Sequence, residues 1–242
     1  MDIRDGFIIG IYNYCDSWCD RCAFTSRCHV FADVREMEAA FDPNLAPVAK
    51  APQHPSDIPP PPPDWLKELL DEMEKDGASS DADDACDRRK RRYVPERDAI
   101  DRRAEEYSRR VREWLGTHES DTWSKEDDPR EVIAWFHMLI HVKAMRALTG
   151  LAEDDPADRE WPPDHDGSAK VALIGIDRSH TAWLDLVEVG TAAAADVEPF
   201  VDELVWLRSA LERTFPKARA FVRPGFDEPE AVARLLRSES EA

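Results

Sequence analysis

Long stretches of this chain place apolar side chains three or four positions apart, the spacing that one face of an α-helix requires. Residues 95–115 show the pattern with charged residues at i and i+4 on the opposite face, where they can pair. The predicted inner face consists of Ile100, Ala104, Tyr107, Val111, Trp114 and Leu115. We therefore predict a long charged helix over this range.

A second helix is predicted from Asp128 to Gly150. Asp128 is a good N-cap, Pro129 fits the first turn, and Gly150 is a typical stop signal. Its apolar positions are Val132, Trp135, Phe136, Leu139, Ile140, Val142, Met145 and Leu148. Because these positions cover more than half the circumference, we predict that this is the central buried helix of the fold.

Residues 168–189 allow two interpretations. The apolar run 171–176 resembles a buried parallel strand, which would make the body of the protein α/β. The apolar pattern nevertheless continues without a turn at helical spacing, through Leu173, Ile176, His180, Trp183, Leu184 and Val187. We favour one long helix.

The remaining elements are shorter or less certain. Helices are predicted over 30–40, 64–75, 197–214 and 228–237, with Pro199 in the first turn of the third. Residues 7–12 fit either a short strand or the buried start of a helix.

These elements predict an all-α fold, a multi-helix bundle with a small N-terminal four-cysteine metal knuckle. Prolines are concentrated in 43–63, which favours an extended linker. The predicted organisation is therefore a metal-binding segment over 1–42 packed on the bundle, a linker over 43–63, and an acidic helical bundle over 64–242.

The charge balance changes the expected partners. The chain carries 51 acidic and 32 basic residues and a net charge of -19, which disfavours nucleic acid and anionic membranes. The one basic run, 88–92, follows the acidic stretch 81–87, which neutralises it locally. With no signal peptide or membrane-spanning run, we expect a cytoplasmic protein whose partner is another protein.

The clearest chemical feature is a cluster of four of the five cysteines. Cys15, Cys19, Cys22 and Cys28 form a Cx3Cx2Cx5C pattern. In a reducing compartment clustered cysteines are metal ligands more often than disulfides, and four thiolates suffice for zinc or an iron-sulfur cluster. The fifth, Cys86, lies in an acidic stretch and is expected to be a free thiol.

The spacing of Cys15, Cys19 and Cys22 resembles the Cx3Cx2C motif of radical S-adenosylmethionine enzymes, whose cluster keeps one iron open. This chain has Arg21 where that family usually has an aromatic residue, and Cys28 supplies a fourth thiolate that would close the open iron. The repeated βα units of a partial barrel are also missing, and the spacing differs from that of bacterial ferredoxins. The pattern therefore favours a closed structural site.

A second candidate site involves histidines. His137 and His141 lie one helical turn apart, and Asp177 precedes His180 by three residues on the next long helix. If those helices pack together, the four side chains form a candidate non-haem metal centre, with Glu203 or Glu105 as a further ligand. Ferritin-like di-iron proteins use a related plan, but with a Glu-x-x-His on each of two helices.

The sequence thus predicts a metal-binding helical protein whose closed four-cysteine site is structural and whose acidic body is an interaction or regulatory module. The alternative is a non-haem metal-dependent oxidoreductase with its site between the two histidine-bearing helices. The pattern does not decide whether the protein is an enzyme.

Overall fold

The computed structural model describes residues 2–41, 94–118, 128–154 and 164–228. The chain forms two compact units, one made of Met1–Asp33 and Arg92–Ala242 and the other of Val34–Arg91. Within the second unit, residues 34–41 are described, and they belong to the C-terminal part of helix α1 (His29–Phe41). The fold and the sites below concern the first unit.

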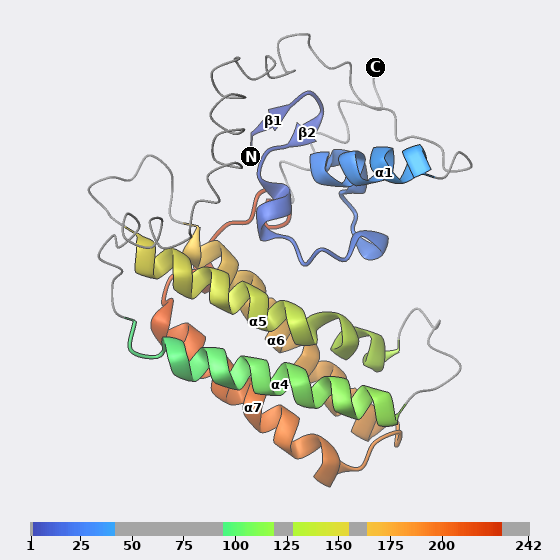
Figure 1. Cartoon of the computed structure of the whole chain (residues 1–242), viewed down its shortest axis with the longest axis vertical. Coiled ribbons are helices and arrows are strands. Elements are labelled where there is room, and N and C mark those ends of the chain that lie inside the picture. Colours follow the sequence, from blue (N-terminus) through green and yellow to red (C-terminus); the bar gives the residue numbers. More distant parts are fainter. Residues whose placement is uncertain (1, 42–93, 119–127, 155–163, 229–242) are drawn as a thin grey trace, which may run out of the picture. The chain divides into compact units, whose positions relative to one another are not determined.

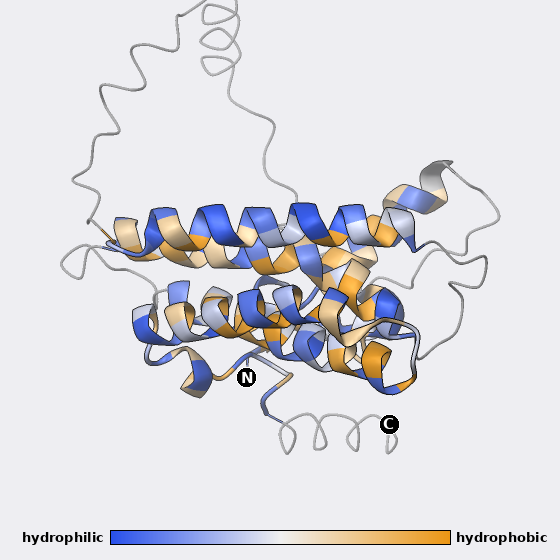
Figure 2. Cartoon of the chain, turned by 90° about the horizontal axis from the view of Figure 1, so that it is seen from below, coloured by the Kyte–Doolittle hydropathy of each residue, from blue (hydrophilic) through white to orange (hydrophobic). Residues whose placement is uncertain are grey.

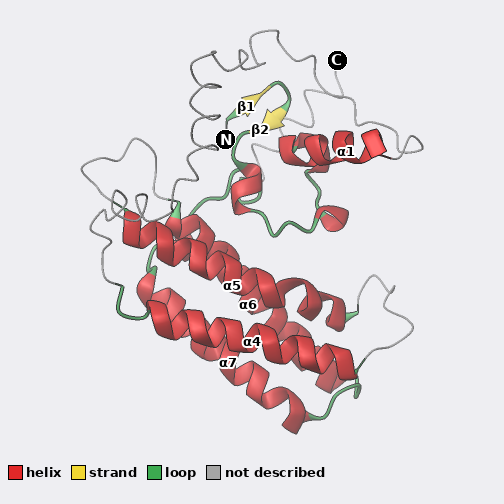
Figure 3. Ribbon diagram, viewed as in Figure 1, coloured by secondary structure: helices red, strands yellow, loops and turns green. Residues whose placement is uncertain are grey.

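Four long helices form the body of this unit: α4 (Arg97–Thr117), α5 (Pro129–Glu153), α6 (His165–Glu188) and α7 (Ala194–Thr214). Each packs against two others, because α4 and α6 both contact α5 and α7 (Figures 1 and 3). Hydrophobic and hydrophilic positions alternate along each helix, as expected for amphipathic helices around a shared core (Figure 2). The predicted all-α bundle is confirmed.

The N-terminal segment begins with a short hairpin. Strands β1 (Ile3–Arg4) and β2 (Phe7–Ile8) pair antiparallel, with Ile3 opposite Ile8. The chain then forms three 3-10 turns, at Ile11–Tyr14, Cys19–Arg21 and Thr25–Arg27, before α1 begins. The segment 7–12 is therefore part strand and part 3-10 turn, and the predicted helix over 30–40 is confirmed.

Helix α4 matches its predicted pattern closely. All six residues of the predicted inner face are buried. On the exposed side, Arg109 pairs with Glu106 one turn before it and Glu113 one turn after it. The helix thus buries its apolar stripe against the bundle while its charges pair with each other in solvent.

Helix α5 departs from the prediction in two ways. Asp128 caps it as predicted, accepting a hydrogen bond from the Arg130 backbone N–H at 2.9 Å. The helix continues past Gly150 to Glu153, so the predicted stop was wrong. At Gly150 an added Cβ would lie 3.4 Å from the Cβ of His165, which shows that this glycine allows close packing rather than ending the helix.

Helix α6, rather than α5, contributes most buried residues to the core. Twelve residues of α6 are buried and eight of α5. Three large apolar residues that broaden the face of α5 stay exposed, namely Trp135, Met138 and Val142. The prediction that α5 is the central buried helix was therefore wrong, because the breadth of an apolar face does not show how much of it is covered.

The two C-terminal helices resolve the remaining alternatives. The run 171–176 lies within α6, so it is helix and not strand. Helix α7 begins at Ala194, three residues before its predicted start, and Pro199 therefore lies inside the helix rather than in its first turn. The predicted elements at 43–63 and 64–75, together with Cys86 and the 88–92 run, lie outside the described residues, as does all but the first residue of the predicted helix over 228–237.

None of the helices in the described part of the chain is long and apolar enough to cross a membrane.

A buried hydrogen bond joins α4 to α6 in the core. The indole Nε1 of Trp183 donates to the hydroxyl of Tyr107 at 3.2 Å, and both side chains are fully buried. Replacing Tyr107 by Phe removes the acceptor and leaves the indole N–H unsatisfied in the core. We expect the free energy of unfolding to fall by about 1–3 kcal/mol, measured by urea denaturation.

The exposed Tyr12 provides a matched control for that experiment. The same Tyr12→Phe change should alter the free energy of unfolding by less than about 0.5 kcal/mol. Equal small effects at both positions would show that the Tyr107–Trp183 bond contributes nothing to stability.

Candidate functional site

The four clustered cysteines line one small cavity in the N-terminal segment. Its volume is about 30 Å³, and its remaining wall is largely apolar, including Ile11, Trp18, Phe31 and Phe226. Cys15, Cys19, Cys22 and Cys28 are all free thiols; Cys19 is exposed and the other three are half-buried. The structure therefore brings the four predicted ligands to one place.

Short turns carry the thiols to this cavity. Two 3-10 turns place Cys19 and Cys28 at their boundaries, and the backbone N–H of Cys22 donates to the carbonyl of Cys19 at 3.1 Å. Between the first two cysteines the backbone enters the left-handed region at Ser17, where φ is 58°. That conformation is uncommon for residues other than glycine and marks a tightly constrained loop.

Electrostatics at the cavity disfavour thiolates when no cation is present. Burial, followed by the three neighbouring thiols and Asp20, raises the pKa of Cys19. Burial also raises the pKa of Cys22, although the Phe24 backbone N–H, which donates to its sulfur at 3.4 Å, opposes the shift. A divalent cation would reverse this balance by favouring the charged form of every thiol.

The thiols are not positioned as a finished coordination shell. Over the described residues, no set of three or more His, Cys, Asp or Glu side chains is arranged so that it could hold a metal ion. The donor number and type fit zinc or a cluster, and all four donors share a cavity. Coordination would thus require the thiols to shift from their positions in this structure.

Aromatic residues form one side of the cysteine segment. Trp18 is only 5% exposed and stacks on Trp135 of α5, with ring centroids 5.0 Å apart. The guanidinium of Arg21 lies 4.2 Å from the centroid of the Trp18 ring, and it also forms an ion pair with Glu131 of α5. These contacts hold the loop between Cys15 and Cys22 against the start of α5.

The segment after α7 covers the other side. At Gly225, where φ is 78°, an added Cβ would lie 3.1 Å from Ile8 and 3.2 Å from Ile11, so the backbone passes close over both. The next residue, Phe226, packs edge-to-face on Phe24 and lines the cysteine cavity. Parts of the chain about 200 residues apart thus line the same cavity.

Residues 13–16, just before and after Cys15, anchor the segment to the bundle. The carbonyl of Asn13 accepts from Lys143 Nζ at 3.0 Å. The carbonyl of Asp16 accepts from Trp135 Nε1 at 2.8 Å, and its carboxylate pairs with Arg178 at 2.9 Å. Cys15 is therefore held by backbone contacts to α5 and a side-chain contact to α6.

Tyr14 supplies the apolar part of this anchor. Its ring packs on Phe221, with centroids 4.8 Å apart, and lies so close to Gly167 that a Cβ there would come within 2.2 Å of it. Burial, and then the neighbouring Asp164 carboxylate, raise the pKa of Tyr14 to about 12. Its hydroxyl therefore stays protonated at neutral pH.

A wider groove of about 850 Å³ adjoins the cysteine cavity, and Trp18 and Cys22 line both. Arg21, Arg178 and Arg223 also line this groove. Each of these arginines already pairs with a carboxylate, on Glu131, Asp16 and Asp227 respectively. The three arginines of this groove thus already have their positive charges balanced by carboxylates of the same chain.

The histidine candidates have separate partners. His137 Nδ1 lies 2.7 Å from the carbonyl of Ala134 in its own helix, and burial lowers its pKa. His141 Nε2 lies 2.8 Å from Asp101 Oδ1 of α4. Both rings are thereby engaged by α4 or α5 rather than by α6.

Asp177 and His180 are directed toward α7 and the segment after it. Asp177 forms ion pairs with Arg208 and Arg219. Burial and then Arg208 lower the pKa of His180, so its ring favours the neutral form. The structure therefore does not gather the four residues around one point, and the non-haem centre stays a prediction.

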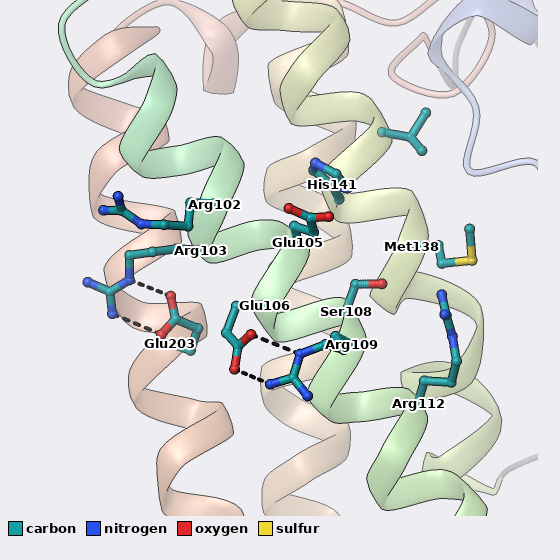
Figure 4. A pocket seen from close by; sticks show the side chains of 11 residues that line it. Arg102, Arg103, Glu105, Glu106, Ser108, Arg109, Arg112, Met138, His141 and Glu203 are labelled. Atoms are coloured by element: carbon teal, nitrogen blue, oxygen red, sulfur yellow. Dashed lines mark hydrogen bonds and ion pairs between the residues drawn. The ribbon is translucent and has the colours of Figure 1, made fainter.

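His141 lines a groove of about 800 Å³ between α4, α5 and α7, together with Glu105 and Glu203 (Figure 4). Glu203 accepts hydrogen bonds from Nε and Nη2 of Arg103, at 2.5 and 2.9 Å. Of the two carboxylates considered as additional ligands, Glu105 lies beside His141 in Figure 4, whereas Glu203 is tied to arginine.

Sequence reasoning missed the residues that hold the cysteine segment in place. Lys143 and Gly167 carry no motif, and their contacts join residues more than 100 positions apart. A signal was present at Lys143, because a lysine stands among the apolar residues of a helix that was predicted to be buried.

No protein-family model matches this chain, and neither the curated proteins nor the solved structures compared with it show a significant match.

Proposed function

We propose that this protein binds a metal at a closed, structural four-cysteine site, and that its acidic helical body serves as an interaction or regulatory module in the cytoplasm. The observation that carries the proposal is that Cys15, Cys19, Cys22 and Cys28 all line one small cavity as free thiols. A reducing compartment keeps such thiols available as ligands.

A structural role is supported by what surrounds the thiols. Four protein ligands complete the coordination of zinc and leave no position for a substrate, which is typical of structural rather than catalytic sites. The walls are provided by Trp18, Phe31 and Phe226, and the loop is tied to α5 and α6. A metal here would cross-link the turns of the N-terminal segment to one another. Because the segment is tied to α5 and α6, the metal would also stabilise its attachment to the bundle.

The size of the cavity favours a single zinc ion over an iron-sulfur cluster. One water molecule needs roughly 10–15 Å³ of such space, so about 30 Å³ accommodates one ion and little else. A cluster of several irons and sulfides would require the walls to move apart. We therefore propose zinc as the metal, with a closed iron-sulfur cluster as the second choice.

The helical body has a surface suited to an interaction role. Met138 and Val142 of α5 are 51% and 54% exposed and lie in the groove of Figure 4. Arg102 and Arg112 line the same groove and form no ion pair within the described residues. Exposed apolar side chains next to unpaired cations are features that protein-binding surfaces share.

Metal analysis and an absorption spectrum of protein purified without oxygen test the proposal. We expect about one zinc per chain and no visible absorption band, since zinc has no accessible redox or d-electron transitions. Iron with a visible band would contradict the zinc assignment. Iron that survives replacement of all four cysteines but is lost in His137→Ala would instead support the oxidoreductase alternative.

A further inference from the structure

Lys143 is a buried cation in the middle of helix α5. Only 7% of the residue is exposed, and its Nζ donates to the carbonyl of Asn13 at 3.0 Å. Lysine is rarely buried to this extent unless an opposite charge accompanies it, because moving an ammonium out of water costs free energy that a single carbonyl only partly returns.

Lys143 differs from the other cations around the cysteine segment. Arg21, Arg146 and Arg178 each form an ion pair with a carboxylate. Lys143 has no carboxylate within ion-pair distance in the described ranges of the chain. It is therefore a buried positive charge without a direct ion-pair partner among the described residues.

The segment that Lys143 binds carries the first of the four clustered thiols. Burial lowers the pKa of Lys143, the Arg146 guanidinium lowers it as well, and the Cys15, Asp164 and Asp16 side chains oppose the shift. Cys15 follows the Asn13 carbonyl, the hydrogen-bond acceptor of Lys143, by two residues. The ammonium thus lies at the bundle side of the thiols.

We propose that the metal–thiolate centre is the counter-charge of Lys143, which makes this lysine a positioning residue that favours metal binding from outside the coordination shell. The inference rests on the proposed function. Four thiolates outweigh the charge of a divalent ion, so the loaded centre is a dianion. A buried ammonium beside it stabilises the loaded state, whereas the same ammonium beside neutral thiols is uncompensated.

This role predicts opposite effects on the two states. The Lys143→Met substitution keeps the length of the chain and removes the charge. Zinc affinity should fall about 10–100-fold, the usual range for groups next to the ligands. The metal-free protein should be no less stable than wild type, because the variant no longer buries an unpaired charge.

Competition with a chromophoric chelator measures the affinity, and urea denaturation of metal-free and zinc-loaded protein measures the stability. Arg102→Met on α4 is the matched control, because it also removes one positive charge, from an exposed side chain that lines the groove of Figure 4 and not the cysteine cavity. It should leave zinc affinity unchanged. Lys143→Arg keeps the charge and should recover more affinity than Lys143→Gln, which keeps only an N–H donor.

Each result bears on the inference. If Lys143→Met binds zinc as tightly as wild type, the charge role is overturned while the metal site stands. If it destabilises both states equally, or if Gln replaces Lys143 as well as Arg does, the lysine only supports the Asn13 carbonyl. A wild-type chain that takes up no metal overturns the proposed function and this inference together. If Lys143→Met does not fold, the Arg and Gln variants decide.

Discussion

Removing the metal from the loaded protein should release the N-terminal segment while the helical bundle stays folded. Metal binding in small zinc modules contributes on the order of 10 kcal/mol of apparent folding free energy. The segment has two 2-residue strands and three short turns, which bury too little to hold the four thiols together alone. The core of the bundle is formed almost entirely by α4 to α7 and the short segment after α7, and Trp18 is the one residue of the cavity wall within that core cluster.

Limited trypsin digestion, before and after a strong chelator, measures this release. Arg21 and Arg27 lie between the ligands, so cleavage after either indicates that the loop has opened. New fragments ending at these residues are expected after chelation, with helical circular dichroism nearly unchanged. An identical digestion pattern with and without metal would contradict a structural role.

Ligand substitution tests the same expectation without a chelator. Cys22→Ser should weaken zinc binding by more than about 100-fold, since changes next to ligands already cost 10–100-fold. The matched control is Cys86→Ser, at the one cysteine outside the motif. We expect that change to leave the zinc content at the wild-type value, and loss of zinc in this control would show that Cys86 is a ligand.

Replacing Gly167 by Ala should displace the anchor of the cysteine segment. The new Cβ would lie 2.2 Å from the Tyr14 ring and 2.9 Å from the Phe221 ring, so both rings must move. Overpacking of this kind costs about 1–3 kcal/mol, more than the helix-propensity gain of up to about 1 kcal/mol. We expect a lower free energy of unfolding by urea denaturation and weaker zinc binding, because Tyr14 adjoins Cys15.

Gly116→Ala is the control for the propensity term. Among the described residues, no atom outside the local backbone of α4 and the residues next to Gly116 lies within 4 Å of a Cβ placed at Gly116, so the same substitution there should be neutral or stabilising by up to about 1 kcal/mol. Opposite signs at the two glycines are therefore expected. If both variants are stabilised, the Tyr14 ring moves aside without cost, and the contact does not anchor the segment.

Periodicity predicted the helices well because their apolar stripes face one shared core. The six inner residues of α4 are all buried, and helical spacing through Trp183 correctly favoured a helix for 171–176. Periodicity failed where local signals compete with packing. Gly150 resembles a stop signal, but its missing side chain admits His165 instead.

The sequence predicted the four cysteines of the candidate site, but not the residues that anchor their segment to the bundle. Closely spaced cysteines show in the sequence because the chain between them is too short to separate their sulfurs widely. The anchoring residues cannot be recognised in the sequence, because Lys143 and Trp135 donate to backbone carbonyls, which every residue possesses. No residue type near Asn13 or Asp16 indicates that a carbonyl there will receive a bond from 119 or 130 positions away.

The long sequence separation of these anchors has a consequence for the order of events during synthesis. The cysteines leave the ribosome before α5 and α6, whose side chains lie 119 to 162 residues farther along from their contacts. At 5–20 residues per second, roughly ten to thirty seconds pass before α6 is complete. Until α5 is complete, the segment that carries the thiols has neither Lys143 nor Trp135 to anchor it. A nascent chain that takes up its metal early must therefore hold it by the sulfurs alone.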